Sequence, residues 1–388
     1  MGKNVIFCAD GTWNSPGQID ADSDTATVSN VFKLFLNLAG TDSPESTLLA
    51  NEQERTLSQQ GVATQAAKYL HGVGDSKNFL VKMLGGSMGA GLVTRIVRGY
   101  TFVSRTYKPG DKIFLIGFSR GAYTARSLAG LIAAKGLLDG NLDLDDKEQA
   151  YKLGAAVWYS YRQSALAAAD RHNFLGDLEN AVDGLPGFFL RPVPAGALTP
   201  PPPIDTVAVW DTVGALGIPE YNRAKVAIDA FRFCDTKLSL KVSHGIHAVS
   251  LDEQRPNFAP TLWDPDDRIV QMLFPGAHAD VGGGYERANN ESGLSDGALR
   301  WMMDQLAPLG VVFAPNPAVP CTPDPKGMAH RPWADPLWQN LPPGPHPRTF
   351  TAAARLQKHP SIAARMAAGN VPSEGGLVGP YAPTNVPP

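Results

Sequence analysis

One junction in the chain constrains the fold more than any other feature. Residues 112–116 are apolar and β-rich, which is typical of a buried strand, and they run directly into Gly117-Phe118-Ser119-Arg120-Gly121. The apolar spacing of residues 122–134 then predicts a helix. A glycine-flanked turn between a strand and a helix is tight, and it projects its central side chain out of the backbone. The sequence therefore predicts that Ser119 stands clear of the backbone at the carboxyl end of a strand.

Strand and helix patterns alternate on both sides of this junction. Short apolar runs predict strands, and helical apolar spacing predicts the helices between them. The expected strands are residues 4–8, 69–73, 206–210, 245–249 and 269–274, and the expected helices include residues 28–38 and 92–107. Residues 41–66 are polar and mixed, and are expected to form a loop with a helical piece. This alternation predicts an α/β fold of three layers with a mostly parallel central sheet. Together with the glycine-flanked serine turn it predicts an α/β-hydrolase-like three-layer sandwich.

The chain is expected to form a single domain over residues 1–388, with its core at about 3–140 and 204–312. Between these core segments, residues 141–203 hold an aromatic-rich helical stretch and end in four consecutive prolines. We expect this insertion to form a helical cap over the site, with an ordinary surface helical hairpin as the alternative. The proline-rich tail, residues 313–388, is expected to be irregular and to wrap the domain surface.

The composition excludes several classes of protein. With 43% hydrophobic and 18% charged residues, the chain is too apolar to be disordered. Its net charge of −3 gives no basic field for nucleic acid, so any peripheral membrane contact depends on local apolar surface. Cys8, Cys234 and Cys321 have neither disulfide nor metal spacing, which predicts reduced thiols. Without a signal-peptide or transmembrane pattern, we expect synthesis in the cytoplasm and export only by a signal-independent route.

A serine hydroxyl is a poor nucleophile until a base removes its proton, and in this type of fold the base is a histidine after a later strand. Ser119 is the predicted nucleophile. His278 follows the strand expected at residues 269–274, and glycines 282–284 let its loop reverse tightly, so we predict His278 as the base. The other seven histidines flank a strand, precede the junction, or lie in the insertion or tail: His71, His172, His244, His247, His330, His346 and His359.

The acid that orients this base should end a strand between the serine and the histidine. Asp211 and Asp252 both fit by position, because they follow the strands expected at 206–210 and 245–249. We favour Asp211, since it ends its strand directly and Asp252 has Arg255 nearby as another partner. Asp280 is close to His278 and is expected to support its loop.

The oxyanion that forms during acyl transfer needs two N–H donors. The backbone N–H of Arg120, directly after the serine, is the predicted first donor. The second is expected from the loop after the strand at residues 4–8, where Gly11 and Thr12 are the candidates. Asp10 is expected to hold that loop rigid.

Several blocks, in order, resemble a known family. They are residues 7–14 (Phe-Cys-Ala-Asp-Gly-Thr-Trp-Asn), 72–74 (Gly-Val-Gly), 110–123 (Gly-Asp-Lys-Ile-Phe-Leu-Ile-Gly-Phe-Ser-Arg-Gly-Ala-Tyr), 209–214 (Val-Trp-Asp-Thr-Val-Gly), 247–253 (His-Ala-Val-Ser-Leu-Asp-Glu) and 274–285 (Phe-Pro-Gly-Ala-His-Ala-Asp-Val-Gly-Gly-Gly-Tyr). From residue 3 to about 305 the chain resembles the bacterial and fungal α/β-hydrolases that include the type VI secretion phospholipase effectors of the first class. The resemblance implies a triad of Ser119, Asp211 and His278, with carboxylic-ester hydrolysis and phospholipase A activity.

The sequence thus predicts a serine ester hydrolase of the lipase or phospholipase A type, with an ester or phospholipid substrate, no nucleic-acid partner and no required cofactor. An esterase or depolymerase for non-lipid esters and a non-catalytic interaction protein are the alternatives. A haloacid-dehalogenase-like phosphatase would begin with a strand and Asp-x-Asp-Gly-Thr, but its nucleophile, the first aspartate, is replaced here by Cys8. A metallohydrolase is also disfavoured, because no pair of histidines has the spacing of metal ligands. Asp10 and Asp280 are expected to be hydrogen-bonded loop carboxylates. The weaker alternative is that one of them binds a structural calcium ion. Nothing in the sequence indicates the oligomeric state.

Overall fold

A computed structural model describes residues 2–11, 27–44, 52–72, 88–165, 192–213, 236–340 and 343–387. Five predictions fall partly or wholly outside these residues. They concern Thr12, part of the stretch 41–66, the end of the strand expected at residues 69–73, most of the second half of the insertion, and the thiol of Cys234.

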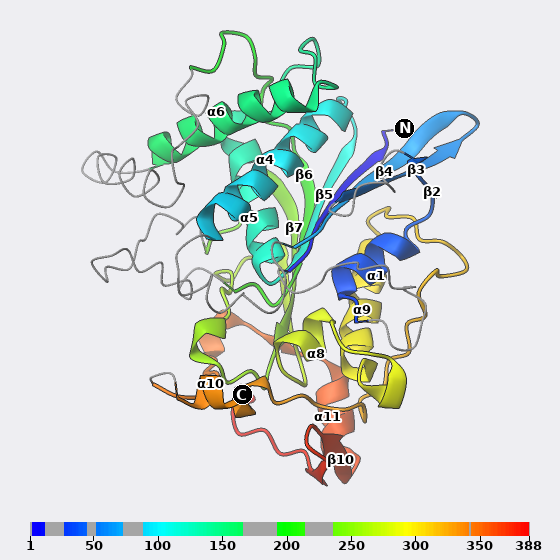
Figure 1. Cartoon of the computed structure of the whole chain (residues 1–388), viewed down its shortest axis with the longest axis vertical. Coiled ribbons are helices and arrows are strands. Elements are labelled where there is room, and N and C mark those ends of the chain that lie inside the picture. The colour runs from blue at the N-terminus through cyan, green and yellow to red at the C-terminus, as the bar shows by residue number, and fades with distance from the viewer. Residues whose placement is uncertain are drawn as a thin grey trace.

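Among the described residues, a nine-stranded sheet runs through the molecule in the order β2-β3-β4-β1-β5-β6-β7-β8-β9 (Figure 1). Its strands are β1 (Asn4–Ala9), β2 (Thr41–Asp42), β3 (Glu52–Gln59), β4 (Val62–Leu70), β5 (Lys112–Phe118), β6 (Ile204–Trp210), β7 (Val242–Ser250), β8 (Ile269–Phe274) and β9 (Gln357–Lys358). Neighbouring strands from β4 to β9 are parallel, whereas β2, β3 and β4 pair antiparallel. The predicted α/β fold with a mostly parallel central sheet is therefore confirmed.

The expectation of a loop is wrong for residues 52–66, because they hold β3 and the first part of β4, and Thr41–Asp42 form β2. Residues 45–51 lie outside the described residues, and the helical piece expected in this stretch stays a prediction. β3 and β4 form a hairpin whose turn residues, Gln60 and Gly61, have φ angles of 51° and 78°. Two-residue hairpin turns of type I′ require positive φ at both positions. β3 is mostly polar and is half-buried along most of its length, so it lacks the alternation of apolar and polar residues that identifies a strand.

Helices cover both faces of the sheet (Figure 1). One face carries α4 (Met88–Thr106), α5 (Arg120–Lys135) and α6 (Lys147–Ala165), and the other carries α1 (Asn30–Asn37) and α9 (Gly293–Leu306). The central strands have an apolar cluster on each side. In β1, Val5 and Phe7 enter one cluster while Ile6 and Cys8 enter the other, because successive side chains of a strand face opposite sides. Two separate hydrophobic cores therefore hold the three layers together.

The insertion contributes α6, which packs against α4 and α5 (Figure 1). Its Trp158 is 1% exposed and belongs to the same hydrophobic cluster as those helices. Residues 166–191 lie outside the described part of the chain. The helical cap over the site, and the division of the single domain into core, cap and tail, stay predictions.

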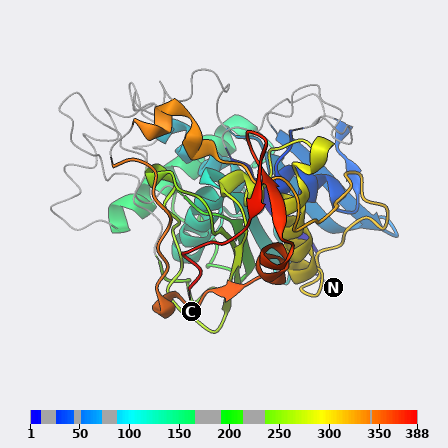
Figure 2. The same cartoon turned by 90° about the horizontal axis from the view of Figure 1, so that it is seen from below.

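The tail contains more regular structure than its prolines indicate. It supplies β9 to the sheet edge, together with α10 (Pro336–Gln339), α11 (Pro360–Ala367) and a hairpin of β10 (Asn370–Ser373) and β11 (Leu377–Pro380). Figure 2 shows this orange and red segment lying across one end of the molecule, which is the lower end in Figure 1. Tail residues therefore reach loops that follow the carboxyl ends of the parallel strands.

Candidate active site

Ser119 lies on the turn between β5 and α5, and its backbone is strained. Its φ of 58° and ψ of −122° are unusual for a residue with a side chain. Only glycine fits at positions 117 and 121, because neighbouring backbone occupies the space that a Cβ would need. A Cβ on Gly117 would overlap the backbone of Gly121, and one on Gly121 would overlap the carbonyl oxygen of Ala9 in β1. The turn, the start of α5 and the end of β1 are therefore packed backbone against backbone.

A continuous hydrogen-bonded series links Ser119 to His278 and Asp211. His278 Nε2 lies 2.8 Å from Ser119 Oγ, and His278 Nδ1 lies 2.5 Å from Asp211 Oδ2. An ionised carboxylate only accepts, so Nδ1 carries the proton and donates it, which leaves Nε2 to accept from the hydroxyl. Each of the three residues is at most 5% exposed. The structure thus brings together residues that follow three different strands, β5, β6 and β8.

The His278 ring lies between two aromatic rings. Phe118 and Phe258 have ring centroids 4.6 Å and 5.0 Å from the imidazole. Burial lowers the pKa of His278, and it outweighs the opposing effect of Asp211. The ring is therefore neutral near neutral pH, which is the state that can take a proton from a hydroxyl. His278 also begins the short helix α8 (His278–Gly282), where its backbone N–H donates to Glu253 Oε2 at 3.1 Å.

Asp211 is held by an arginine from the tail that sequence reasoning missed. Arg348 Nη1 donates to Oδ1 at 2.7 Å, and its Nη2 donates to Oδ2 at 2.9 Å. The backbone N–H of Ser250 also donates to Oδ1, at 3.0 Å. Burial would raise the pKa of Asp211, but Arg348 and His278 together hold it well below its usual range. No periodicity or motif around Arg348 signals this contact across 137 residues of chain.

Asp252, the alternative acid, lies elsewhere. Its Oδ2 accepts from the backbone N–H of Gly276 at 2.6 Å, and Tyr381 donates to the same carboxylate at 2.8 Å. Burial raises its pKa to about 6. Asp252 therefore braces the loop that leads to His278. The expected pairing of Arg255 with Asp252 is wrong, because Arg255 forms its ion pair with Glu253.

Asp280 also supports the loop around His278. Its Oδ2 accepts from the backbone N–H groups of Ala277 at 2.9 Å and His330 at 3.0 Å. Its Oδ1 accepts from His330 Nδ1 at 2.6 Å. His330, which lies in the tail, is therefore a second residue through which the end of the chain contacts the site.

The loop after β1 lies directly against the Ser119 turn. A Cβ on Gly11 would lie 3.3 Å from Ser119 Cβ. Asp10 is fully buried, and its carboxylate accepts from Ser29 Oγ, Tyr69 Oη and the Gly11 N–H, each at 2.6 Å. Burial raises the pKa of Asp10. The Gly11 N–H is thus engaged by Asp10, and Thr12 lies outside the described residues.

Within the part of the chain that the structure describes, no group of three or more His, Cys, Asp and Glu side chains could hold a metal ion. Asp10 and Asp280 are surrounded by N–H and O–H donors instead. His247 is buried in β7, where its Nε2 accepts from the Thr212 N–H at 3.1 Å, so its role is to anchor the residue after Asp211.

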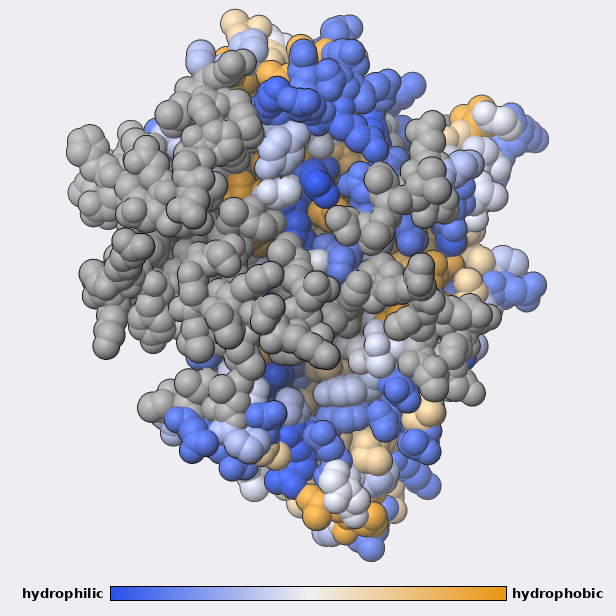
Figure 3. Space-filling model, in the orientation of Figure 1, coloured by the Kyte–Doolittle hydropathy of each residue, from blue (hydrophilic) through white to orange (hydrophobic). Residues whose placement is uncertain are grey.

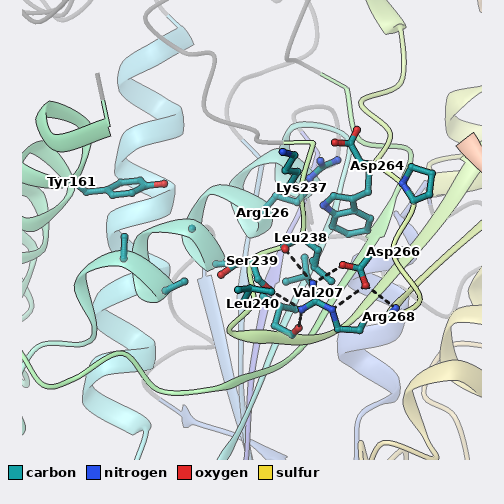
Figure 4. A pocket seen from close by; sticks show the side chains of 17 residues that line it. Arg126, Tyr161, Val207, Lys237, Leu238, Ser239, Leu240, Asp264, Asp266 and Arg268 are labelled. Carbon is teal, nitrogen blue, oxygen red and sulfur yellow. Dashed lines mark hydrogen bonds and ion pairs between the residues drawn. The ribbon is translucent and has the colours of Figure 1, made fainter. Parts of the chain in front are cut away.

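A cavity of about 660 Å³ is lined by residues of α5, α6 and β6 and of the loops before β7 and β8 (Figure 4). Figure 4 shows Tyr161 of α6 on one side of it and the loop residues Ser239, Leu240 and Arg268 on the other. Ser119, Asp211 and His278 are not among its lining residues. The cavity is therefore separate from the candidate active site.

No described helix is both long enough and apolar enough to cross a membrane. On the face seen in Figure 3, the apolar residues drawn in orange lie in small separate groups over the described part of the chain.

A parallel sheet whose central strand enters a helix through a strained serine turn defines an α/β fold of the hydrolase type. Residues 3–305 match the model of the family described as the catalytic domain of type VI secretion phospholipase effectors of the Tle1-like kind, and the chain belongs to this family. The resemblance identified from the sequence blocks is thereby confirmed.

Similar proteins are known from sequence and from structure. The uncharacterized protein YEL023C of Saccharomyces cerevisiae is 26% identical over 272 residues, which cover 70% of this chain and 34% of that protein. An uncharacterized protein from Pseudomonas aeruginosa is 16% identical with a TM-score of 0.44, over 84% of this chain and 49% of that one. A Tle1 effector bound to the VgrG spike of a type VI secretion system is 15% identical with a TM-score of 0.40, over 81% and 74%. The chain thus spans about a third of the first relative and half of the second.

Proposed function

We propose that the chain is a serine carboxylic-ester hydrolase of the phospholipase A or lipase type, acting through an acyl-enzyme on Ser119. The observation that carries the proposal is the hydrogen-bonded series from Ser119 through His278 to Asp211 at the carboxyl edge of the sheet. Membership of the Tle1-like family supports a lipid ester as the substrate.

In the first step, Ser119 Oγ attacks the ester carbonyl carbon while its proton passes to His278 Nε2. Asp211 keeps the Nδ1 proton in place and stabilises the imidazolium that forms. The same imidazolium then protonates the leaving alcohol, and the acyl group stays on Ser119. Water attacks the acyl-enzyme with His278 again as the base, which releases the carboxylic acid and restores the serine.

The oxyanion of the tetrahedral intermediate needs preorganised donors. Arg120 is the first residue of α5, and backbone N–H groups at the start of a helix point toward its N-terminal end, here toward Ser119. The loop after β1 lies beside the same turn and remains the predicted source of the second donor, from Gly11 or Thr12. Because Gly11 already donates to Asp10, Thr12 is the better candidate. Each donor is worth about 3 kcal/mol of the barrier.

The test uses a panel of esters with graded acyl length, together with phospholipid vesicles, on wild type and Ser119→Ala. A fluorophosphonate, which labels activated serines irrespective of substrate preference, reports on Ser119 directly. Ser127→Ala is the matched control, because Ser127 is a buried serine of α5, the helix that follows Ser119.

We expect wild type and Ser127→Ala to hydrolyse at least one lipid ester and to take one label. We expect Ser119→Ala to lose activity by about 10⁴-fold or more and to take no label. Cleavage of short or polymeric esters alone would favour the esterase or depolymerase alternative. Full activity in Ser119→Ala, or no label on wild type, would overturn the proposal and favour a non-catalytic protein.

A further inference from the structure

We propose that Arg348 is a positioning residue of the acyl-transfer site, which fixes the Asp211 carboxylate for His278, so that the catalytic unit extends beyond the family match at residue 305. The inference rests on the proposed function, because it assigns Arg348 a role only if Ser119, His278 and Asp211 act together. Arg348 lies 43 residues after the end of the matched segment, residues 3–305.

Arg348 and Asp211 form a bidentate ion pair. Nη1 meets Oδ1 at 2.7 Å and Nη2 meets Oδ2 at 2.9 Å. A planar guanidinium that binds both oxygens sets the plane of the carboxylate as well as its distance, which a lysine ammonium cannot do. Because His278 Nδ1 binds Oδ2 in the same arrangement, the rotation of the carboxylate determines whether the imidazole proton finds its acceptor.

The guanidinium is itself held by rigid backbone. Arg348 Nη1 donates to the carbonyl oxygen of Ser250 at 2.7 Å, and its Nη2 donates to the carbonyl oxygen of Phe258. The side chain of Arg348 is 5% exposed. Asn385, near the end of the chain, donates to the carbonyl oxygens of both Arg348 and Leu251, at 3.1 Å and 2.9 Å. The tail therefore ties the end of β7 to the carboxylate that follows β6.

Asp211 needs such support for two reasons. Its φ of 35° places the backbone in the left-handed region, which a non-glycine residue occupies only when surrounding contacts impose it. Its side chain is fully buried, so an ionised carboxylate there requires both hydrogen bonds and a counter-charge. Arg348 supplies two of the hydrogen bonds and the counter-charge.

A purely structural ion pair and a positioning residue differ in their effect on pH dependence. The charged groups that face His278 are Asp211 after β6 and Glu253 and Arg255 after β7, while Asp280 of its own helix is engaged by His330. If Arg348 is removed, Asp211 is left as an uncompensated buried anion. The apparent pKa of the Asp211–His278 pair therefore rises. Whether the added proton lies on Asp211 or on His278, the imidazole can no longer act as a general base.

The experiment compares Arg348→Gln, Arg348→Lys and Arg348→Ala with wild type and Asp211→Asn. We would measure kcat and KM between about pH 5 and 9 on the ester that wild type cleaves, and the rate of fluorophosphonate labelling. Thermal unfolding would report the folded fraction of each variant. Arg365→Gln is the matched control, because Arg365 is another buried tail arginine, and its hydrogen bonds go to the carbonyl oxygens of Pro325, Gly327 and Pro372.

We expect Arg348→Gln to lose kcat and labelling rate by about 10–100-fold with little change in KM, and its acid limb to move to higher pH. Arg348→Lys should fall between it and wild type, and added methylguanidinium should partly restore Arg348→Ala. Arg365→Gln should lower thermal stability but keep the wild-type pH profile.

A folded Arg348→Gln with wild-type kcat and pH profile would overturn the inference. If that variant does not fold, a folded Arg348→Lys with both properties unchanged would overturn it equally. The inference would also be overturned if the activity lost in Arg348→Gln and in Arg365→Gln equalled the unfolded fraction of each variant. Failure of the proposed function is a different result, since Ser119→Ala would then keep full activity.

Discussion

Two isosteric substitutions, Asp211→Asn and Asp252→Asn, separate the acid that the geometry favours from its positional rival. In Asp211→Asn the amide would face both His278 Nδ1 and Arg348 with one accepting oxygen, where the carboxylate has two. The imidazole then loses its tautomer-fixing acceptor, which costs about 10⁴-fold in kcat, or about 5.5 kcal/mol of barrier. Breaking the buried ion pair with Arg348 costs a further 3–5 kcal/mol, roughly, of folding stability.

Asp252→Asn should have almost no effect on kcat. An amide oxygen can still accept from the Gly276 N–H and from Tyr381. Because burial raises the pKa of Asp252 to about 6, the folded protein already binds a proton there more readily than the unfolded chain does. Wild-type stability relative to Asp252→Asn should therefore rise as the pH falls from above 6 toward 4.

The assays are ester turnover, fluorophosphonate labelling and urea unfolding of both variants at several pH values. The reasoning fails if Asp252→Asn loses activity by orders of magnitude while Asp211→Asn stays near wild type. It fails in part if both variants lose activity equally, because the acid would then not be a single residue.

Three further predictions concern the turn, the base and the core. Gly121→Ala should lower the free energy of unfolding by about 1–3 kcal/mol or more and reduce kcat, because the new Cβ overlaps the end of β1. Gly140→Ala should change neither quantity in urea unfolding and turnover assays, because the space around Gly140 is open. The acid limb of kcat/KM should have its midpoint below 6.5, because burial lowers the pKa of His278 and keeps the base neutral to lower pH; a midpoint above 7 would contradict this. Lys33→Met should leave Asp296 as an unpaired buried charge and cost about 3–5 kcal/mol of stability, with kcat of the folded protein unchanged.

How much of this site could be predicted from sequence depends on how local each signal is. The Ser119 turn is local, since strand, glycines and helix follow one another within about 25 residues. The place of His278 and Asp211 follows from chain order, because parallel strands bring their carboxyl ends to one edge of the sheet. The strands β1, β5, β6, β7 and β8 were predictable because their apolar runs are continuous, as expected when both faces are buried. The strand expected at residues 69–73 was misplaced, because β4 runs from Val62 to Leu70.

The contacts of the tail leave no such trace. Arg348, His330 and Tyr381 stand in proline-rich sequence without periodicity, and each meets its aspartate across at least 50 residues. The error over Arg255 has a similar cause, because adjacent Asp252 and Glu253 are equivalent by spacing and only the three-dimensional turn selects the glutamate. The polar strand β3 is hidden for another reason: most of its residues are only half-buried, so neither of its faces needs an apolar pattern.

Burial lowers the pKa of His278 although two carboxylates contact it. Asp211 binds its Nδ1 and Glu253 accepts its backbone N–H, yet each carboxylate is matched by an arginine, Arg348 and Arg255 respectively. Burial is the largest effect on the pKa of His278; it outweighs the two carboxylates, and Arg255 acts in the same direction, so the resting ring stays neutral. Removing either arginine unbalances this arrangement toward a protonated ring, but only Arg348 also fixes the plane of Asp211. Replacing Arg348 or Arg255 should therefore move the acid limb of the pH profile to higher pH in both cases. At pH values above that limb, kcat should be lower in the Arg348 variant than in the Arg255 variant.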